Sequence, residues 1–433
     1  MPWARLDFTN VDKTQAYIKR SKSFPLEVTI FKNKEESSLE DAFLLAIPHI
    51  KRFKTLAIVG TSDLPNLTRH LTLPTPSLKE LTIDFNCNPT PVLDNILVNL
   101  DLSSLCTLSL GGIITRLPWK NLWNLTTFKL RCPPDNTITV MQLLNFFEST
   151  PHLRDITLRD SVPTSSNAPS SRVVHLLHLK NLTIFGNPAH GILLNHLSIP
   201  DGASLVLDFD FRGDKSPFPA CLPRTNKYLK NLFRVTAVNL CFDGGTRFVR
   251  LDGPSGTLYM FGHFVSFPQK SSLYLNPRIL QSLDYFSLHI TRSLVIAEYR
   301  ALMPLQTNES PSSCILFRMK DLRTLTLTRC DNLPFIFALN PGCNPSEIIH
   351  CPKLEELTLY VEEWGALDLP EVVRMAEERE SRGAKLRLVK IVGLGELLLR
   401  REVFELRKYV MHVEYRFEEN PPKWDSVPDY ESD

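Results

Sequence analysis

The feature that most constrains this chain is a short pattern, Leu-x-x-Leu-x-Leu, that recurs along 433 residues. Ile or Phe replaces Leu in some copies, and a weaker copy opens at Phe53. In the first half of the chain, five successive centres are separated by 27, 20, 28 and 26 residues. The copies are centred on Leu56, Leu81, Leu108, Phe128, Ile156, Leu182, Leu325 and Leu357.

The end of each copy, Leu-x-Leu, alternates apolar and other residues as a half-buried strand does. One such strand cannot bury its leucines alone, but parallel copies stacked side by side bury them in a continuous core. The spacing also fits the leucine-rich-repeat range of about 20–29 residues. We therefore predict an α/β leucine-rich-repeat solenoid, with a curved parallel sheet, helices on its convex side, irregular repeats and terminal caps. Leu81, Leu108, Ile156 and Leu182 should share one sheet.

A second regularity follows the motif. Asn86, Asn187 and Cys330 each stand three residues after the last apolar residue of a copy. Leucine-rich repeats use Asn or Cys at this corner, where the side chain can hydrogen-bond the turning backbone. Other copies depart from this rule.

Helical spacing of apolar residues appears between several copies. Residues 40–47, 92–102 and 140–147 have this spacing, and Thr137 or Thr139 can cap the third segment. The resulting order of strand, turn and helix is the content of an α/β solenoid.

The regularity decays between residues 200 and 320, where we predict repeats with insertions and keep a separate small β domain as the alternative. Short strands are expected there at 205–207, 235–240, 258–260, 273–275 and 286–288. The predicted organisation is an N-terminal cap (1–39, with a strand at 26–31), the solenoid (40–365), a C-terminal cap (366–417) and an acidic flexible tail (418–433). The C-terminal cap should contain a helix at 370–382 and strands at 386–391 and 413–415.

The composition bounds the partners and the compartment. A formal net charge of +2 produces no strong field toward nucleic acid or a membrane, and we predict neither as a partner. The N-terminal residues lack the apolar core of a secretory signal, and no apolar run reaches the length of a membrane-spanning helix. We therefore expect a monomer in the cytoplasm or nucleus.

We find no pattern that predicts catalysis, a cofactor or a metal. Gly111-Gly112 and Gly393-x-Gly395 lack the spacing of a phosphate-binding loop and are interpreted as turns. His175 and His178 lack the Glu of a metalloprotease motif. Cys343, His350 and Cys351 could hold zinc only with a further ligand, and Cys351 is more simply a small buried residue opening a repeat. The predicted protein is not an enzyme.

Solenoids of this kind bind through the residues between the leucines, on the concave face of the sheet. Arg and aromatic residues are typical of protein-recognition hot spots. Asp84, Asp155 and Glu356 on the same face argue against nucleic acid, and a merely solvated basic stripe is the alternative interpretation. The predicted protein-binding residues are Lys129, Arg131, Arg154, Arg159, Phe185 and Tyr360.

Four segments carry a resemblance to a known family. The segments "PWARLD", "DFTNVDKTQAYIKRSKSFPLEVTIF", "EDAFLLAIPHIKRFKTLAI" and "CPKLEELTL", with the ending "HVEYRF…PPKWD", resemble the region that follows the F-box in fungal, basidiomycete-type F-box proteins with leucine-rich repeats. The resemblance implies the substrate-recognition part of a cullin-type ubiquitin ligase receptor. No F-box precedes Trp3, so the ligase linker subunit is an expected partner only if an F-box lies upstream. The alternative function is a leucine-rich-repeat scaffold or regulator unrelated to ubiquitination.

Overall fold

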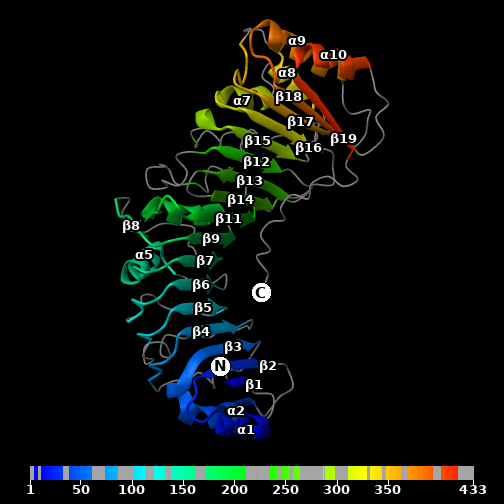
Figure 1. Cartoon of the computed structure of the whole chain (residues 1–433). Helices are drawn as coiled ribbons and strands as arrows, with labels where there is room; N and C mark the ends of the chain where they lie inside the picture. Colours follow the sequence, from blue (N-terminus) through cyan, green and yellow to red (C-terminus); the bar gives the residue numbers. More distant parts are fainter. Residues whose placement is uncertain are drawn as a thin grey trace, which may run out of the picture. The chain divides into compact units, whose positions relative to one another are not determined.

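The computed structural model divides the chain into two compact units. Unit 1 comprises Met1–Asp210 and Ala220–Asn231, and unit 2 comprises Phe211–Pro219 and Leu232–Asp433. Each unit is α/β and is built on an open, mostly parallel sheet (Figure 1). The structure describes residues 4–7, 11–32, 39–60, 74–85, 102–112, 121–132, 138–160, 171–186, 188–210, 222, 235–241, 246–253, 257–263, 286, 288–297, 311–328, 332–343, 348–361, 369–393 and 401–417.

In unit 1, neighbouring strands of the main sheet follow one another along the chain, and each pair is parallel. A separate short parallel pair is formed by β8 (Val174–His175) and β10 (Leu197–Ser198). The strands of the main sheet are β1 (Ala4–Asp7), β2 (Leu26–Lys32), β3 (Phe53–Gly60), β4 (Glu80–Phe85), β5 (Thr107–Gly111), β6 (Thr127–Arg131), β7 (Asp155–Arg159), β9 (Asn181–Gly186) and β11 (Ser204–Asp210).

The register aligns the apolar motif from strand to strand. Leu81 pairs with Leu108, Leu108 with Phe128, Phe128 with Ile156, and Ile156 with Leu182. All five side chains are buried. The prediction that the motif leucines share one parallel sheet is therefore confirmed. The same buried column continues through Leu56 of the weaker copy and through three residues outside the predicted series, Leu6, Val28 and Leu205.

Along the chain, the described helices of unit 1 alternate with its strands. The prediction for 40–47 is confirmed in its main part by α2, whereas residues 92–101 lie outside the described residues. So do Asn86, Asn187 and Cys330, the predicted corner residues. The helices are α1 (Val11–Ser21), α2 (Leu39–Ala46), α5 (Val140–Ser149) and the 3₁₀ segments η1 (Ile47–Arg52) and η2 (Pro188–His196).

Helix α5 begins where the sequence predicts. Thr139 is its N-cap, and a reciprocal capping box links it to Gln142, whose backbone N–H donates to Thr139 Oγ1 at 3.2 Å. In return, the Thr139 backbone N–H donates to Gln142 Oε1 at 2.8 Å. Such a box satisfies two N–H groups that a helix start leaves unpaired. The buried face of α5 packs against the sheet, with the rings of Phe146 and Phe128 4.4 Å apart.

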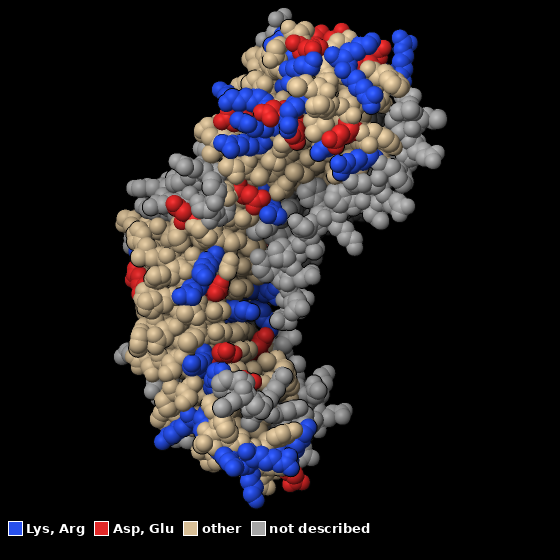
Figure 2. Space-filling model, viewed as in Figure 1, with Lys and Arg blue, Asp and Glu red and all other residues tan. Residues whose placement is uncertain are grey.

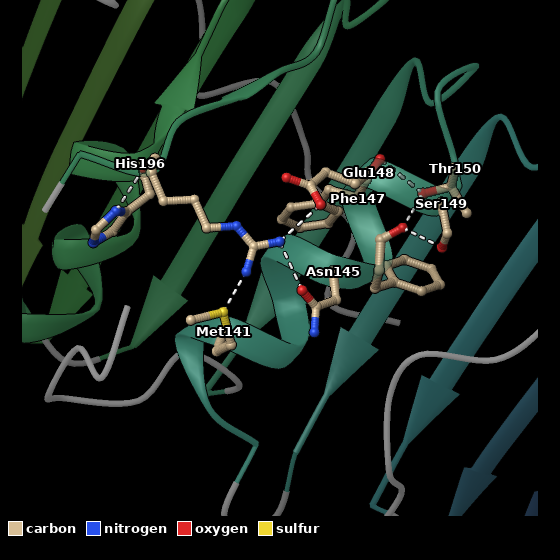
Figure 3. A network of polar contacts seen from close by, with 9 residues as sticks. Met141, Asn145, Phe147, Glu148, Ser149, Thr150 and His196 are labelled. Carbon is tan, nitrogen blue, oxygen red and sulfur yellow. Dashed lines mark hydrogen bonds and ion pairs between the residues drawn. The ribbon is translucent and has the colours of Figure 1, made fainter. Parts of the chain in front are cut away.

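A polar network joins α5 to the chain around β8 (Figure 3). The Arg172 guanidinium donates to Asn145 Oδ1 at 2.6 Å and to Glu148 Oε2 at 2.7 Å, and it contacts the Met141 sulfur. The Arg172 carbonyl accepts a hydrogen bond from His196 Nδ1 at 3.0 Å. Met141, Asn145 and Glu148 lie on one side of the helix because four- and three-residue steps return to the same face. Arg172 therefore holds α5 and the end of η2 together.

The sheet of unit 2 is parallel except at one end. There β12, β13 and β14 pair antiparallel, while β12 also pairs parallel with β15 and so continues the sheet. From β15 to β19 each neighbouring pair is parallel. The strands are β12 (Ala237–Cys241), β13 (Thr246–Asp252), β14 (Thr257–His263), β15 (Ser293–Ala297), β16 (Thr324–Thr328), β17 (Glu356–Val361), β18 (Leu388–Gly393) and β19 (His412–Phe417).

The irregular region contains strands that were predicted and strands that were not. Strands β11, β12 and β14 occupy the predicted segments 205–207, 235–240 and 258–260, whereas 273–275 lies outside the described residues. The prediction of a strand at 286–288 is wrong where the structure describes it, because Leu288–Ile290 forms the 3₁₀ segment η6. Strands β13 and β15 were not predicted.

The C-terminal part of unit 2 has the predicted helix and strands. Helix α9 (Leu369–Ser381) matches 370–382, and Gly383 adopts φ +78° after it. Around α9 and α10 (Arg401–Tyr409), basic and acidic side chains are closely interspersed (Figure 2). They include the ion pairs Lys385–Glu380 at 2.5 Å and Lys408–Glu405 at 2.6 Å. The remaining helices are α7 (Pro311–Arg318), α8 (Leu333–Leu339) and the 3₁₀ segment η7 (Pro341–Cys343).

No helix among the described residues is long and apolar enough to cross a membrane.

Candidate functional site

The candidate site is the outward surface of strands β4 to β7 and β9 in unit 1, which we name the ladder face. Alternation along β4, β6 and β7 buries the motif residues and directs the residues between them away from the core. The same positions follow in register on β5 and β9, although Gly111 and Thr183 there are buried. Parallel pairing then aligns the outward residues into three columns. The ladder face consists of Glu80, Thr107, Thr127, Asp155 and Asn181 (first column), Thr82, Ser109, Lys129, Thr157 and Thr183 (second column) and Asp84, Gly111, Arg131, Arg159 and Phe185 (third column).

The third column holds an ion pair that spans two strands. Arg131 on β6 reaches the Asp84 carboxylate on β4, passing over the intervening position, which is Gly111 on β5. A Cβ atom on Gly111 would lie 2.2 Å from Asp84 Oδ1. The missing side chain of Gly111 therefore makes room for the ion pair. Both partners are partly exposed, so the pair contributes little to stability, and we assign it mainly to positioning Arg131.

The next positions of the same column form a cation–π pair. The Arg159 guanidinium lies over the Phe185 ring, 4.7 Å from its centroid. Such an arrangement orders the arginine side chain and leaves a planar cation beside an aromatic surface. Both residues are half-buried. Arg and aromatic residues held in this way are common in the energetic centres of protein interfaces.

The carboxylates of the first column are also engaged. Asn181 donates from its amide to Asp155 Oδ1 at 2.6 Å, and Thr55 on β3 donates to Glu80 Oε2 at 3.5 Å. In the second column Lys129 is exposed on β6, between Ser109 and Thr157 in register. The column of small polar residues therefore carries a single cationic side chain near its middle.

The structure brings four of the six predicted binding residues together on the ladder face: Lys129, Arg131, Arg159 and Phe185. Arg154 is not in an outward column, because it precedes β7 by one residue and lies at the edge where strands begin. Its side chain is exposed, and its carbonyl accepts hydrogen bonds from the backbone of Lys180 and Asn181. Tyr360 lies on β17 in unit 2 and is half-buried.

The roles of Asp84 and Gly111 in positioning Arg131 were not predicted from the sequence. A glycine at an outward strand position, flanked in register by Asp and Arg, is the signal that could have indicated an ion pair across it. The sequence predicted that Gly111 and Gly112 lie in a turn. This is correct only for Gly112, which has φ +59°. A Cβ atom on Gly112 would lie 1.6 Å from the Phe85 carbonyl oxygen, so the backbone approach there requires glycine.

The histidine and cysteine candidates for metal binding do not assemble. His175 ends strand β8 and is exposed, and the ring of His178 lies beside that of His152, with centroids 5.6 Å apart. Cys343 is exposed, whereas Cys351 is buried as expected. Within the described ranges, no group of three or more His, Cys, Asp or Glu residues is placed to hold a metal ion.

The buried turn at Cys351 in unit 2 has a structural role instead. Cys351 adopts φ +47°, and its thiol donates to the Leu316 carbonyl at 3.2 Å. Burial raises the pKa of Cys351 to about 12, against the opposing effect of the Arg379 charge. The thiol is therefore neutral at physiological pH, which makes it a poor nucleophile and a poor metal ligand.

The neighbouring His350 predicts a pH dependence of stability. Burial, reinforced by the charge of Arg379, lowers the pKa of His350 from its ordinary value of 6.5. The unfolded chain therefore binds a proton at a higher pH than the folded chain does. The contribution of neutral His350 to the stability of unit 2 is fully present above about pH 6.5 and is lost as the pH falls toward the lowered pKa.

The denaturant midpoint of unit 2 should therefore decline over that pH range in the wild type, and the decline should be smaller in His350→Gln. A matched change at an exposed position of the same unit, His412→Gln, should leave the decline intact.

Comparison of the sequence with protein-family models found no match. Comparison with curated proteins also found none that matches.

Proposed function

We propose that the chain is a leucine-rich-repeat solenoid that binds another protein on the ladder face, without catalysis of its own. The observation that carries this proposal is the register of β4 to β9, which combines a continuous buried column of motif residues with ordered charged and aromatic side chains on the outward side. Repeat proteins of this type use an extended sheet surface for recognition.

The contacts within the ladder face support recognition over simple solvation. Arg131 is oriented by Asp84, and Arg159 is oriented by the ring of Phe185. A long side chain that is already ordered loses less conformational entropy on binding. An exposed stripe that serves only solubility gains nothing from this ordering.

The narrower proposal is that this recognition selects substrates for an F-box-type ubiquitin ligase, in the cytoplasm or nucleus. Its support is the resemblance of residues 2–31, 40–58, 351–359 and 412–425 to the region after the F-box in fungal proteins. The ligase linker subunit then belongs to the assembly only through an F-box upstream of these residues. A scaffold or regulator outside ubiquitination is the alternative, and it uses the same face.

Quantitative affinity purification tests the binding proposal. The tagged chain, in wild-type form and with Arg159→Ala and Phe185→Ala combined, is used to enrich proteins from extract. A matched control combines Arg407→Ala with Phe404→Ala, which removes another arginine–aromatic pair on α10 of unit 2. We expect a set of proteins that the wild type and the control recover and the ladder-face variant loses.

Recovery of the same proteins by all three forms would contradict binding through the ladder face. Proteasome inhibition separates the two functional alternatives. Under the ubiquitination proposal the recovered partners accumulate in cells when the proteasome is inhibited, whereas a scaffold partner does not.

A further inference from the structure

The centre of the ladder face concentrates positive charge on two neighbouring strands. Arg131 on β6 pairs in register with Arg159 on β7, and Lys129 lies two residues from Arg131 on the same strand. Adjacent strands are about 4.8 Å apart, so these cations repel one another. Asp84 on β4 neutralises the charge of Arg131, and it lies two strands from Arg131, on the side away from Arg159.

Three described carboxylates, those of Asp84, Asp155 and Asp208, border this centre. Asp155 belongs to the first column and accepts the Asn181 amide. Asp208 on β11 pairs in register with Phe185, beyond the arginines. The backbone of Lys129 is paired in the sheet, but its ammonium group makes no hydrogen bond or ion pair with any residue that the structure describes. The space between Lys129 and Arg159 is therefore favourable for an anion supplied by a partner.

We propose that the ladder face binds an acidic protein segment, with partner carboxylates contacting Lys129 and Arg159 and a neighbouring apolar side chain packing against Phe185. This inference rests on the proposed function and adds the chemical class of the partner. Carboxylate binding between the two cations relieves their repulsion and adds charge-assisted hydrogen bonds. The aromatic ring next to the arginine supplies apolar contact area in the same place.

The bordering carboxylates favour a protein segment over a nucleic acid. A nucleic acid presents phosphates at regular short intervals along its length. Phosphates that follow the third column from Arg159 would meet Asp208 on one side and Asp84 on the other. A protein segment can place its carboxylates only where the cations are, and the net charge of +2 gives no wider basic field.

The test uses the full chain immobilised and two random peptide pools. One pool contains Glu, Asp, Leu, Phe and Ser, and the other replaces the acids with Gln and Asn. We expect selective retention of the acidic pool, with retention falling as salt rises. Lys129→Glu combined with Arg159→Glu should reduce retention by on the order of tenfold. Lys79→Glu, a single charge reversal at an exposed residue just before β4, should leave retention unchanged.

Retention of the acidic pool no greater than that of the neutral pool would overturn the inference. Tighter binding of a single-stranded oligonucleotide than of the acidic pool would also overturn it. Because charge reversal could disturb folding, Lys129→Gln combined with Arg159→Gln is measured alongside, with unfolding midpoints for each variant. Partners from the affinity purification that are lost by the Arg159→Ala, Phe185→Ala variant but bind the Lys129→Gln, Arg159→Gln variant normally would refute acidic recognition while leaving binding through the ladder face in place.

Discussion

Replacement of Leu108 or Leu182 by alanine should lower the free energy of unfolding of unit 1 by roughly 2–5 kcal/mol, the range for emptying a buried leucine site. Both side chains are fully buried and pair in register with buried residues on each neighbouring strand. The surrounding sheet cannot collapse into the space, because backbone hydrogen bonds on both sides of the strand fix its position.

Urea denaturation followed by a signal from unit 1 measures this loss. Leu177→Ala is the matched control, because the same atoms are removed from a side chain that is 74% exposed. It should shift the midpoint little. Midpoints near that of the wild type for Leu108→Ala and Leu182→Ala would show that neither residue supports the core.

Replacement of Arg379 by alanine should lower the stability of unit 2 by about 3–5 kcal/mol, the range for truncating a large, fully buried side chain. Arg379 on α9 is fully buried and donates to the carbonyls of His350 and Cys351, each at 2.9 Å. Burial lowers its pKa to about 10, so the side chain remains charged at neutral pH. Truncation leaves a cavity and two buried carbonyls without their donor, and each effect is unfavourable.

Hydrogen exchange localises this effect. The amides of α9 and of the turn at His350 and Cys351 should exchange faster in Arg379→Ala, since the arginine fastens the helix to that turn. Arg374→Ala changes an exposed arginine on the same helix and should leave exchange near the wild-type rate. Equal exchange in the two variants would mean that Arg379 does not hold the turn.

The sheet could be predicted wherever the leucine motif is intact, because one residue type fixes both alternation and burial there. Strand β15 escaped prediction since Thr291 occupies the position of the first leucine. This threonine is fully buried, and its hydroxyl donates to the Val235 carbonyl at 3.2 Å. A hydrogen bond to a distant carbonyl replaces apolar contact, and no local pattern can indicate it.

The candidate site was predictable to the extent that it depends on alternation. Lys129, Arg159 and Phe185 follow from counting positions along each strand. The pairing of Arg131 with Asp84 could not be predicted, because it depends on the register of three strands and on the absent side chain of Gly111. Arg154 lies outside the outward columns, because it precedes β7 by one residue.

The alignment of outward residues into columns has a consequence for how binding preferences can change. Each strand contributes one residue to a column, and an exposed residue such as Lys129 can change without affecting the buried column beneath it. A point mutation at Lys129 can therefore alter what the protein recognises at one location, whereas a change at Asp84, Gly111 or Phe185 also affects the arginine beside it. Affinity for a new target can accumulate in single steps, strand by strand, with every intermediate still a folded protein.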